Sequence, residues 1–520
     1  LIAPETTGPQ TASWNEFNPL FARNRTAVNL GALLGGNSTA GNDLSLAGLH
    51  DRFSYSLGLH HYETDGFRPN NGLEKDIAGA FAQVALSPDT SIQAEYRYRD
   101  VTYGDIALNW NPEDYSDTKQ VSRRENIPRL GIRHSLNSRH HFIGSSTYNQ
   151  TEYSLNEQTE AGLGPFGPVV VEEDRKEEFD AYNAEGQYLY RSNGFNLVAG
   201  AGYYNQDVDG KVSIVGASGP LVLFSDDSQE STQLRHTNGY VYAYLEPRTS
   251  IQITMGLSAE DLDEDNIDEQ QLNPKFGVSW QPTAALTLRG AAFRTLKRSL
   301  VANQTIEPTQ VNGFNQFFDD PLATDARRYG LGIDYQITEK LTFGVETTFN
   351  DMTHQIVDVT TGELVDDDYE EYHYRTFLYW AAHPQIAVSA DYLFDQYQRD
   401  FPETGSTWPY NLKTHTLPLT VSFFHPNGLC AKVRGTYISQ RVKQWLDTAL
   451  PNETLRDDFA LLDFSIGYQL PNRYGLINLS ITNVFDTNFN YQDMNFLTPN
   501  EQDPGIKPER QVFLSASFSF

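Results

Sequence analysis

The chain has almost no cysteine, little positive charge and no long apolar run. Cys430 is the only cysteine among 520 residues, which excludes an internal disulfide framework and a metal centre built from several cysteines. No run approaches the roughly 18 apolar residues of a membrane-spanning helix, so a helical membrane protein is excluded. Lysine and arginine total 38 against 68 acidic residues, and this net charge of -30 argues against nucleic acid as a partner.

The short motifs of common catalytic and cofactor sites are also missing. The sequence contains no GxSxG, no phosphate-binding P-loop, no HExxH and no CxxCH for covalent haem. The pairs His60-His61 and His140-His141 are adjacent in expected strands, so each pair divides between two faces and does not chelate one metal through neighbours. We therefore predict that the protein is not an enzyme and carries no resident cofactor.

Alternation of apolar and polar residues is present instead, and it is clear in the last ten residues. Val512, Leu514 and Phe518 fall on one face of a strand, while Ser515 and Ser517 fall on the other. One face suits lipid and the other suits water. A strand that closes the chain on an aromatic residue resembles the assembly signal of bacterial outer-membrane barrels, and we assign that signal to Phe518 and Phe520.

The same alternation recurs in pairs of segments joined by short turns and separated by long polar stretches. The turns contain Pro, Asn, Asp or Gly, as in residues 87–90, 192–194 and 471–473. The long polar stretches are residues 105–126, 155–178, 207–236, 296–327 and 488–510. About ten hairpins plus the first and last strands give about 22 strands.

The predicted fold is therefore all-β, a transmembrane antiparallel β-barrel with short periplasmic turns and long extracellular loops. Residues 1–25 are a periplasmic lead-in and residues 26–520 form the barrel. The 30 Phe, 29 Tyr and 6 Trp residues suit aromatic girdles at the two membrane interfaces. A tyrosine-rich soluble sandwich or propeller is the alternative that this composition leaves open.

Charged residues on the second face of these strands predict a polar lumen. Ile92, Tyr96 and Tyr98 alternate with Glu95 and Arg97, and a soluble sheet seldom puts such charge on an inner face. The residues predicted to face the lumen are Glu95, Arg97, Arg99, Arg289, Glu346, Asp391, Lys432 and Arg434.

Two acidic clusters are the candidate metal sites. Asp261, Asp263 and Asp265 have the first three spacings of a calcium loop, but Asn266 stands where the loop needs Gly and Leu272 where it needs Glu. Asp366, Asp367 and Asp368 form a second run. These clusters either bind a cation such as Ca²⁺ or keep the loops soluble.

Three segments of the chain resemble the barrel of the TonB-dependent receptor family. Residues 272–283, LNPKFGVSWQPT, are similar to a hairpin in the middle of that barrel; residues 483–487, NVFDT, are similar to its penultimate-strand motif; and residues 518–520, FSF, match its end. The resemblance implies a 22-stranded barrel. It also implies a plug and an energy-coupling box, for which the 25 residues before the first expected strand leave no room.

The sequence thus predicts a transport channel or receptor barrel of the bacterial outer membrane, with both termini periplasmic and with its plug missing from this chain or supplied by another domain or partner. Its expected partners are outer-membrane lipid, lipopolysaccharide, the barrel assembly machinery and a plug or other periplasmic protein. The alternatives are an export pore or membrane anchor of a larger periplasmic or extracellular assembly and, further off, a sheath around an electron carrier.

Overall fold

The computed structural model describes residues 24–164, 166–265, 267–301, 304–317, 320–357, 364–399, 409–444, 453–494 and 504–520. The predicted lead-in, residues 1–25, therefore lies outside the described residues except for its last two. No helix in the described ranges is long and apolar enough to cross a membrane.

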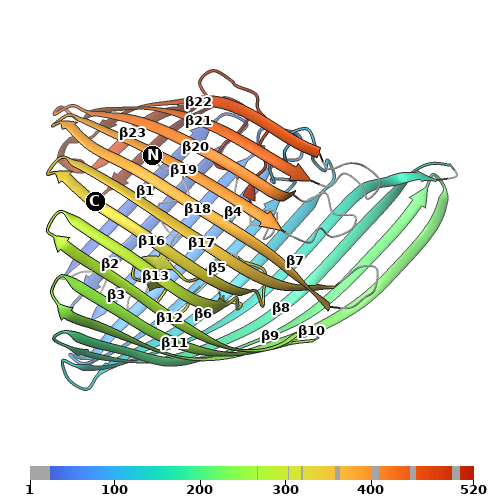
Figure 1. Cartoon of the computed structure of the whole chain (residues 1–520). Coiled ribbons are helices and arrows are strands. Elements are labelled where there is room, and N and C mark those ends of the chain that lie inside the picture. The colour runs from blue at the N-terminus through green and yellow to red at the C-terminus, as the bar shows by residue number, and fades with distance from the viewer. Residues whose placement is uncertain are drawn as a thin grey trace.

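The described chain forms one closed antiparallel sheet of 22 strands, which confirms the predicted fold and strand number (Figure 1). Its first eleven strands are β1 (Arg25–Gly35), β2 (Ala40–His50), β3 (Phe53–Thr64), β4 (Leu73–Ser87), β5 (Thr90–Tyr103), β6 (Gln120–Ser135), β7 (His140–Gly164), β8 (Gly167–Ser192), β9 (Phe195–Ser218), β10 (Leu221–Arg248) and β11 (Ile251–Glu264). The others are β12 (Ile267–Thr283), β13 (Leu286–Leu296), β16 (Asp325–Thr338), β17 (Leu341–Val357), β18 (Leu364–His383), β19 (Ile386–Arg399), β20 (Pro409–Phe424), β21 (Leu429–Gln444), β22 (Glu453–Gln469), β23 (Gly475–Thr482) and β24 (Gln511–Ser519).

The last strand closes the barrel against the first. β24 pairs with β1 from Asn29 opposite Ser519 to Gly35 opposite Phe513. Beyond that register, the backbone N–H groups of Val28 and Phe520 donate to each other's carbonyl oxygens, with N···O distances of 3.1 and 2.9 Å. Closure leaves no free edge along the wall, as a structure surrounded by lipid requires.

The outer face of the wall is apolar and the inner face is polar. On β16, Tyr329, Leu331 and Ile333 point outward and are 48%, 65% and 43% exposed, whereas Ala326 and Arg328 point inward and are buried. Aromatic rings line up on the outer face, as in Tyr329, Phe349 and Tyr372 on three neighbouring strands. This is the arrangement expected when lipid surrounds the wall and polar groups fill the interior.

All the short turns predicted from Pro, Asn, Asp and Gly join consecutive strands at one end of the barrel. The hairpins of residues 87–90 and 192–195 close directly between paired residues. Both ends of the described chain lie at this same end, because Arg25 is opposite Leu49 beside the first turn and Phe520 stacks on Tyr474 beside the last. The opposite end carries the long connections.

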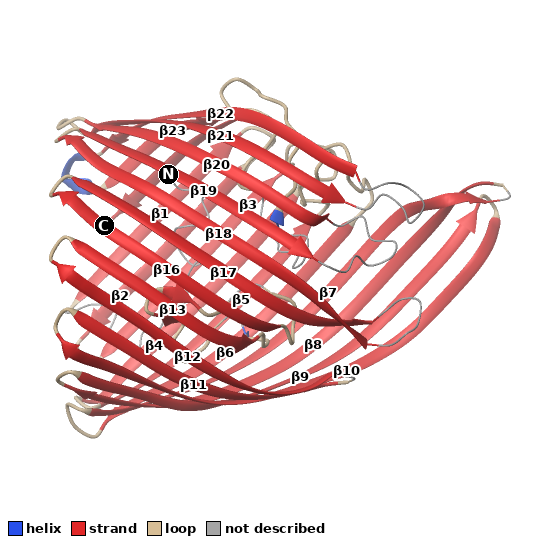
Figure 2. Ribbon diagram, viewed as in Figure 1, coloured by secondary structure: helices blue, strands red, loops and turns tan. Residues whose placement is uncertain are grey.

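Two of the stretches predicted as loops, residues 155–178 and 207–236, consist of strand in their described residues, apart from the turns at Phe166 and at residues 219–220. They are the outer parts of β7–β10, which continue past the ends of β6 and β11 and project from the rim (Figures 1 and 2). Residues 172–178 and 226–230 carry charge on both strand faces, so periodicity gave no apolar side to identify there. Residues 207–214 do alternate, with Val208, Val212 and Ile214 on one face, and this strand signal was missed. Outside the membrane both faces of such a sheet contact water, and an apolar face is unnecessary. We call residues 157–178 and 207–233 the flap.

The described residues of the remaining long stretches are largely irregular. Residues 104–119 connect β5 to β6, residues 297–324 connect β13 to β16, and residues 483–510 connect β23 to β24. The middle connection contains a short hairpin, β14 (Gln310–Val311) and β15 (Phe314–Asn315). We call residues 297–324 the inner loop, since its contacts lie inside the barrel.

Candidate functional site

The inner loop contacts the inner face of the wall along β6, β8, β10 and β12. Arg129 Nη1 on β6 donates to Gln304 Oε1 at 2.6 Å. Glu185 on β8 accepts from the Ile306 backbone N–H at 3.1 Å and from the Thr305 hydroxyl at 2.5 Å. Outward residues of the same strands, such as Tyr182 on β8 and Val241 on β10, are exposed on the opposite face. The loop therefore fills part of the lumen.

A buried charged cluster fixes the middle of the inner loop to β10 and β12. Glu307, 2% exposed, accepts from Arg298 Nη2 at 2.7 Å and from the Tyr242 hydroxyl at 2.6 Å. Lys275 Nζ lies 3.3 Å from the same carboxylate and donates to Gln316 Oε1 at 2.6 Å. Two positive groups thus meet one carboxylate where no water screens them.

The electrostatics of the Glu307–Arg298 pair favour its ionised form. Burial alone would raise the pKa of Glu307, but Arg298 and Lys275 hold it below its ordinary value. Burial works against the charge of Arg298 as well, yet Glu307, Glu260 and Glu185 raise its pKa. Both members of the pair therefore stay charged at neutral pH, and each depends on the other to remain so.

Two glycines of the wall make room for the tip of the inner loop. The tip turns at Asn312 and Gly313, both with positive φ, in the Asn-Gly pattern of a tight hairpin. A Cβ added to Gly330 on β16 would meet the ring of Phe314 at 2.3 Å, and one added to Gly277 on β12 would meet Asn312 at 2.5 Å. Any larger residue at these positions would push the hairpin off the wall.

A second group of connections enters the lumen near β20–β22. The segment around Trp110 pairs with the segment around Gln492: the Trp110 N–H donates to Gln492 Oε1 at 3.1 Å, and the Tyr491 N–H donates to the Trp110 carbonyl at 3.1 Å. Gln440 on β21 is fully buried and binds the Gln492 backbone in both directions, at 2.7 and 3.0 Å. Connections 104–119 and 483–510 therefore pack on each other and on the wall.

A cavity of about 610 Å³, lined by both charged and apolar residues, remains between this second group and the wall. Lys432 and Arg434 on β21, Asp463 on β22, and Asp493 and Lys507 from connection 483–510 contribute charged groups to its lining. A space of this size and polarity can hold water, ions or a small hydrophilic solute.

The eight residues predicted to face the lumen lie on the inner face in the structure. Arg99 Nη1 is 2.9 Å from Glu125, and Asp391 Oδ1 accepts from Arg375 at 2.8 Å. Arg289 bridges Asp334 and Glu346 at 3.0 and 2.9 Å. The Arg289 guanidinium also lies 5.4 Å from the centre of the Phe314 ring, so it touches the inner loop. Glu95 and Arg97 lie on β5 beside Arg99, and Lys432 and Arg434 line the cavity.

The structure does not gather either acidic candidate into one site. Asp261 and Asp263 lie exposed on the outer face of β11, and Asp265 lies in the following turn. Asp367 points inward and pairs with Arg399 at 2.7 Å, whereas Asp366 and Asp368 lie on the other face of β18. Binding of Ca²⁺ at either cluster therefore remains a prediction.

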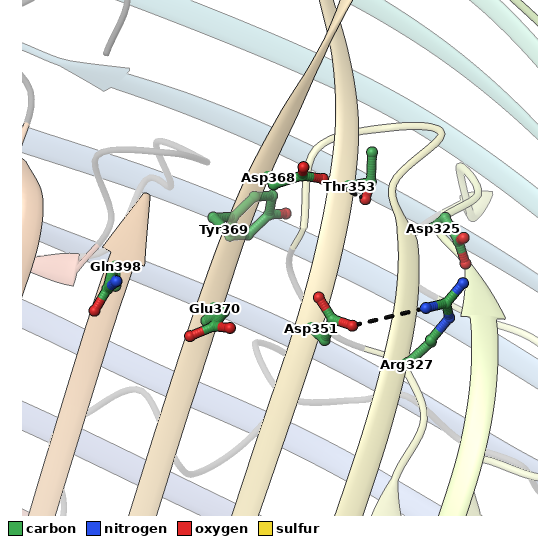
Figure 3. A pocket seen from close by; sticks show the side chains of 8 residues that line it. All are labelled: Asp325, Arg327, Asp351, Thr353, Asp368, Tyr369, Glu370 and Gln398. Carbon is green, nitrogen blue, oxygen red and sulfur yellow. Dashed lines mark hydrogen bonds and ion pairs between the residues drawn. The ribbon is translucent and has the colours of Figure 1, made fainter. Parts of the chain in front are cut away.

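Asp368 instead borders a hollow of about 320 Å³ on the outside of β16–β19 (Figure 3). Asp325, Asp351 and Glu370 add carboxylates to it, and Arg327 lies 3.9 Å from Asp351. The hollow lies closer to the long-connection end than the outward ring of Tyr329, where lipid headgroups are expected.

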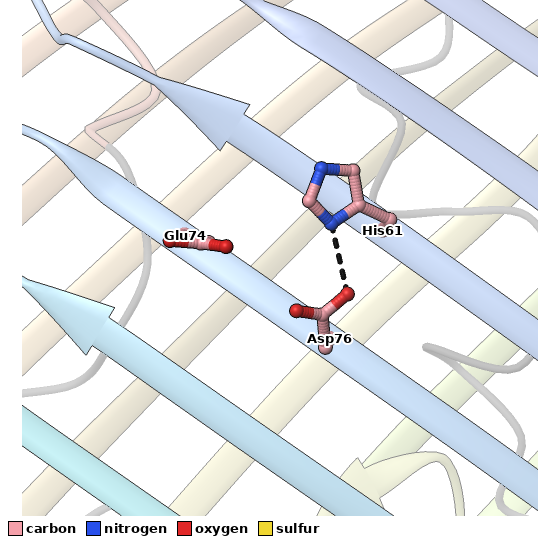
Figure 4. A group of neighbouring side chains, drawn as sticks. All are labelled: His61, Glu74 and Asp76. Atoms are coloured by element: carbon pink, nitrogen blue, oxygen red, sulfur yellow. Dashed lines mark hydrogen bonds and ion pairs between the residues drawn. The ribbon is translucent and has the colours of Figure 1, made fainter.

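One group with metal-ligand atoms was missed by sequence reasoning. His61, Glu74 and Asp76 place one potential ligand atom each within 4.8 Å of one another on the outer face of β3 and β4 (Figure 4). His61 Nδ1 lies 2.8 Å from Asp76 Oδ1 because the two residues are opposite each other in the sheet. Only the strand register reveals this proximity.

The assignment of Phe518 and Phe520 as an assembly signal concerns the closing strand. Phe520 is 60% exposed and stacks on Tyr474, with ring centres 6.3 Å apart. Phe518 lies opposite both Gly475 on β23 and Leu30 on β1. The two rings thus lie at the seam where the barrel closes, and recognition by the assembly machinery remains a prediction.

Comparison with known proteins supports the fold through structure alone. No family model matches the sequence, and no curated protein matches it. Among solved structures, the ferripyoverdine receptor of the outer membrane of Pseudomonas aeruginosa aligns with 97% of this chain and 72% of its own, at a TM-score of 0.71 and 13% identity. The ferric yersiniabactin uptake receptor FyuA from Yersinia pestis aligns with 97% of this chain and 81% of its own, at 0.67 and 14%.

The copper transporter OprC aligns over 96% of this chain and 81% of its own, with a TM-score of 0.68 and 11% identity. The likeness to TonB-dependent receptor barrels that the sequence predicted is thus confirmed for the fold.

Proposed function

We propose that the protein is a transport channel or receptor barrel of the bacterial outer membrane, whose lumen is narrowed by its own inner loop and whose remaining passage is controlled by a plug supplied by another domain or partner. The short-turn end, with both chain ends, faces the periplasm in this proposal, and the flap lies outside the cell. The observation that carries the proposal is the cavity with charged lining residues that remains between connections 104–119 and 483–510 and strands β21–β22.

The fold supports the proposal because neighbours at this similarity are named as receptors and transporters of iron complexes and copper. The inner wall supports it because Arg289, Lys432, Arg434 and Asp391 offer a polar path. A purely structural anchor has no need of charged residues along its interior, whose desolvation costs free energy.

Solute flux into proteoliposomes tests this function. Liposomes containing the purified chain are mixed with neutral hydrophilic solutes of increasing size, and swelling is followed by light scattering. A channel admits the smallest solutes and excludes larger ones, whereas a barrel sealed by its own loops admits none.

A second candidate, an export pore or surface anchor of a larger assembly, is favoured by one observation. The flap projects past the rim and takes no part in lining the cavity. Absence of flux together with stable insertion into liposomes would select this candidate.

A further inference from the structure

The flap is a single four-stranded unit whose two hairpin tips are tied together. The Phe166 backbone N–H donates to Ser218 Oγ at 3.1 Å, and the Ser218 hydroxyl donates to the Gly167 carbonyl at 3.0 Å. Ser218 is fully buried between the two turns. The four strands therefore present one continuous sheet to whatever contacts them.

One edge of this sheet is free over a long distance. β11 pairs with β10 only from Leu234 onward, so residues 221–233 pair with β9 on one side, and no residue of the described ranges pairs with them on the other. Thirteen residues of strand extend over about 43 Å. Such an edge is a row of backbone donors and acceptors that can take an additional strand.

The tip beside this edge is apolar and exposed. Leu221, Val222, Leu223 and Phe224 are 41–58% exposed, and Phe166 on the neighbouring turn is 64% exposed. We expect lipid headgroups at the outward ring of Tyr182, and Val170 at the same tip lies twelve residues farther along β8, which corresponds to about 40 Å along the strand. This distance places the patch outside the lipid. An apolar patch outside the bilayer is typical of a protein-binding surface.

The negative charge of the flap indicates the chemistry of the protein that can bind to it. Residues 157–178 and 207–233 contain twelve acidic and three basic side chains, and none of the acidic ones is buried. Pairing of this edge with a second copy would bring Asp226, Asp227 and Glu230 against one another, which is unfavourable. Residues 221–233 contain neither Lys nor Pro, two residue types that natural proteins use to block a free edge.

We propose that the flap binds an extended, lysine- or arginine-rich segment of another protein, which adds to the outer edge of β10 at residues 221–233 as a fifth strand. Backbone hydrogen bonds along the edge hold the segment, and the carboxylates of Asp226, Asp227 and Glu230 select its positive charge. Apolar residues at one end of the segment cover the tip around Phe224.

Three synthetic peptides and the full chain in detergent test this proposal. The first peptide alternates lysine and valine, the second alternates glutamate and valine, and the third is the lysine peptide with a proline at its centre. We expect the first to bind at least tenfold more tightly than the other two, and to slow hydrogen exchange of the backbone amides of residues 221–233.

Two protein variants separate the edge from general acidity. The triple change Asp226→Lys, Asp227→Lys and Glu230→Lys reverses charge along the edge and should abolish binding of the lysine peptide. The matched change Asp261→Lys and Asp263→Lys reverses exposed charge on the outer face of β11 and should leave binding unchanged.

The proposal is overturned if the proline peptide binds as well as the lysine peptide, since charge attraction without strand addition would then explain binding. It is also overturned if the amides of residues 221–233 are protected without peptide and the protein dimerises with rising concentration, since a second copy would then occupy the edge. If the triple variant does not fold, binding of the three peptides to the unmodified chain still tests the proposal.

Discussion

The inner loop and the flap are both long excursions from the same end of the barrel, yet one folds inward and the other projects outward. Glu307 of the inner loop is buried against Arg298 and Lys275. The carboxylates of the flap outnumber its positive groups fourfold and stay in contact with water. A carboxylate can be buried at low cost only where a positively charged group pairs with it.

The inner loop and the flap also differ in the space that the barrel wall leaves for them. Glycines at positions 277 and 330 leave space for the β14–β15 hairpin. The flap has no facing wall and carries its large apolar residues at an exposed tip. Whether a long connection folds into the barrel or projects from it thus depends more on matching charges and matching shape at the wall than on the length of the connection.

Removal of the Glu307 carboxylate should have the largest effect on the attachment of the inner loop, and none on the flap. Glu307→Ala leaves Lys275 buried without its nearest carboxylate and leaves Arg298 with the more distant Glu260, at 3.7 Å. The loss costs about 3–5 kcal/mol and should release the inner loop from the wall. Hydrogen exchange of residues 304–316 measures the release. Glu230→Ala, at an exposed position of the flap, is the control and should change nothing there.

Low pH should also release the inner loop from the wall, to a smaller extent, by protonating Glu307. The pKa of Glu307 in the folded protein is lowered, so its ion pairs stabilise the loop fully above the ordinary glutamate pKa of about 4.3 and lose that contribution as pH falls through the lowered value. The protection factors of the inner-loop amides, which are exchange rates corrected for the intrinsic effect of pH on amide exchange, should therefore be constant from pH 8 to about pH 5 and fall in stronger acid. Equal acid sensitivity in Glu307→Gln would show that another group is responsible.

Filling a wall glycine tests the steric half of the comparison. Gly330→Leu places a side chain where the Phe314 ring lies and should destabilise the loop's attachment by about 1–3 kcal/mol. Gly79→Leu is the matched control, since Gly79 lies on the inner face of β4 with open space before it. Both variants are compared by exchange of residues 310–316. Equal exchange in the two would contradict the packing described for the hairpin.

Untying the flap should have the smallest effect. Ser218→Ala removes the hydroxyl that joins the two hairpin tips and should cost about 1 kcal/mol locally. Faster exchange should be confined to the turns at residues 164–168 and 217–222. Faster exchange of the inner loop in this variant would show that the two regions are coupled.

Much of this fold could be predicted from sequence because its rules are local. Pro471 and Asn472 mark the turn at residues 471–473, and alternation marks the strands on either side, so strand number follows from counting. The same reasoning failed for residues 155–178 and 207–236: residues 172–178 and 226–230 carry charge on both strand faces, and the alternation of residues 207–214 was overlooked among polar neighbours.

The candidate site was less accessible to sequence reasoning because it depends on contacts between distant segments. Glu307 lies 32 residues from Lys275, and nothing local in the loop indicates that their side chains meet. The closeness of His61 and Asp76 depends on strand register. The Asn312-Gly313 pair was a usable signal, since it is typical of a tight hairpin and identifies the loop's tip.

Single-channel conductance of two excision variants tests most directly whether the inner loop, and not the flap, narrows the lumen. Residues 299–322 can be replaced by a short turn, because the Lys297 N–H donates to the Thr324 carbonyl at 2.8 Å and holds the loop's ends together. Residues 159–171 and 210–230 can each be replaced by an Asn-Gly turn, because Gln158 is opposite Glu172 and Asp209 is opposite Ser231. We expect conductance in planar bilayers to rise severalfold when the inner loop is removed and to stay unchanged when the flap is shortened. An unchanged conductance in the first variant, or a rise in the second, would contradict the account.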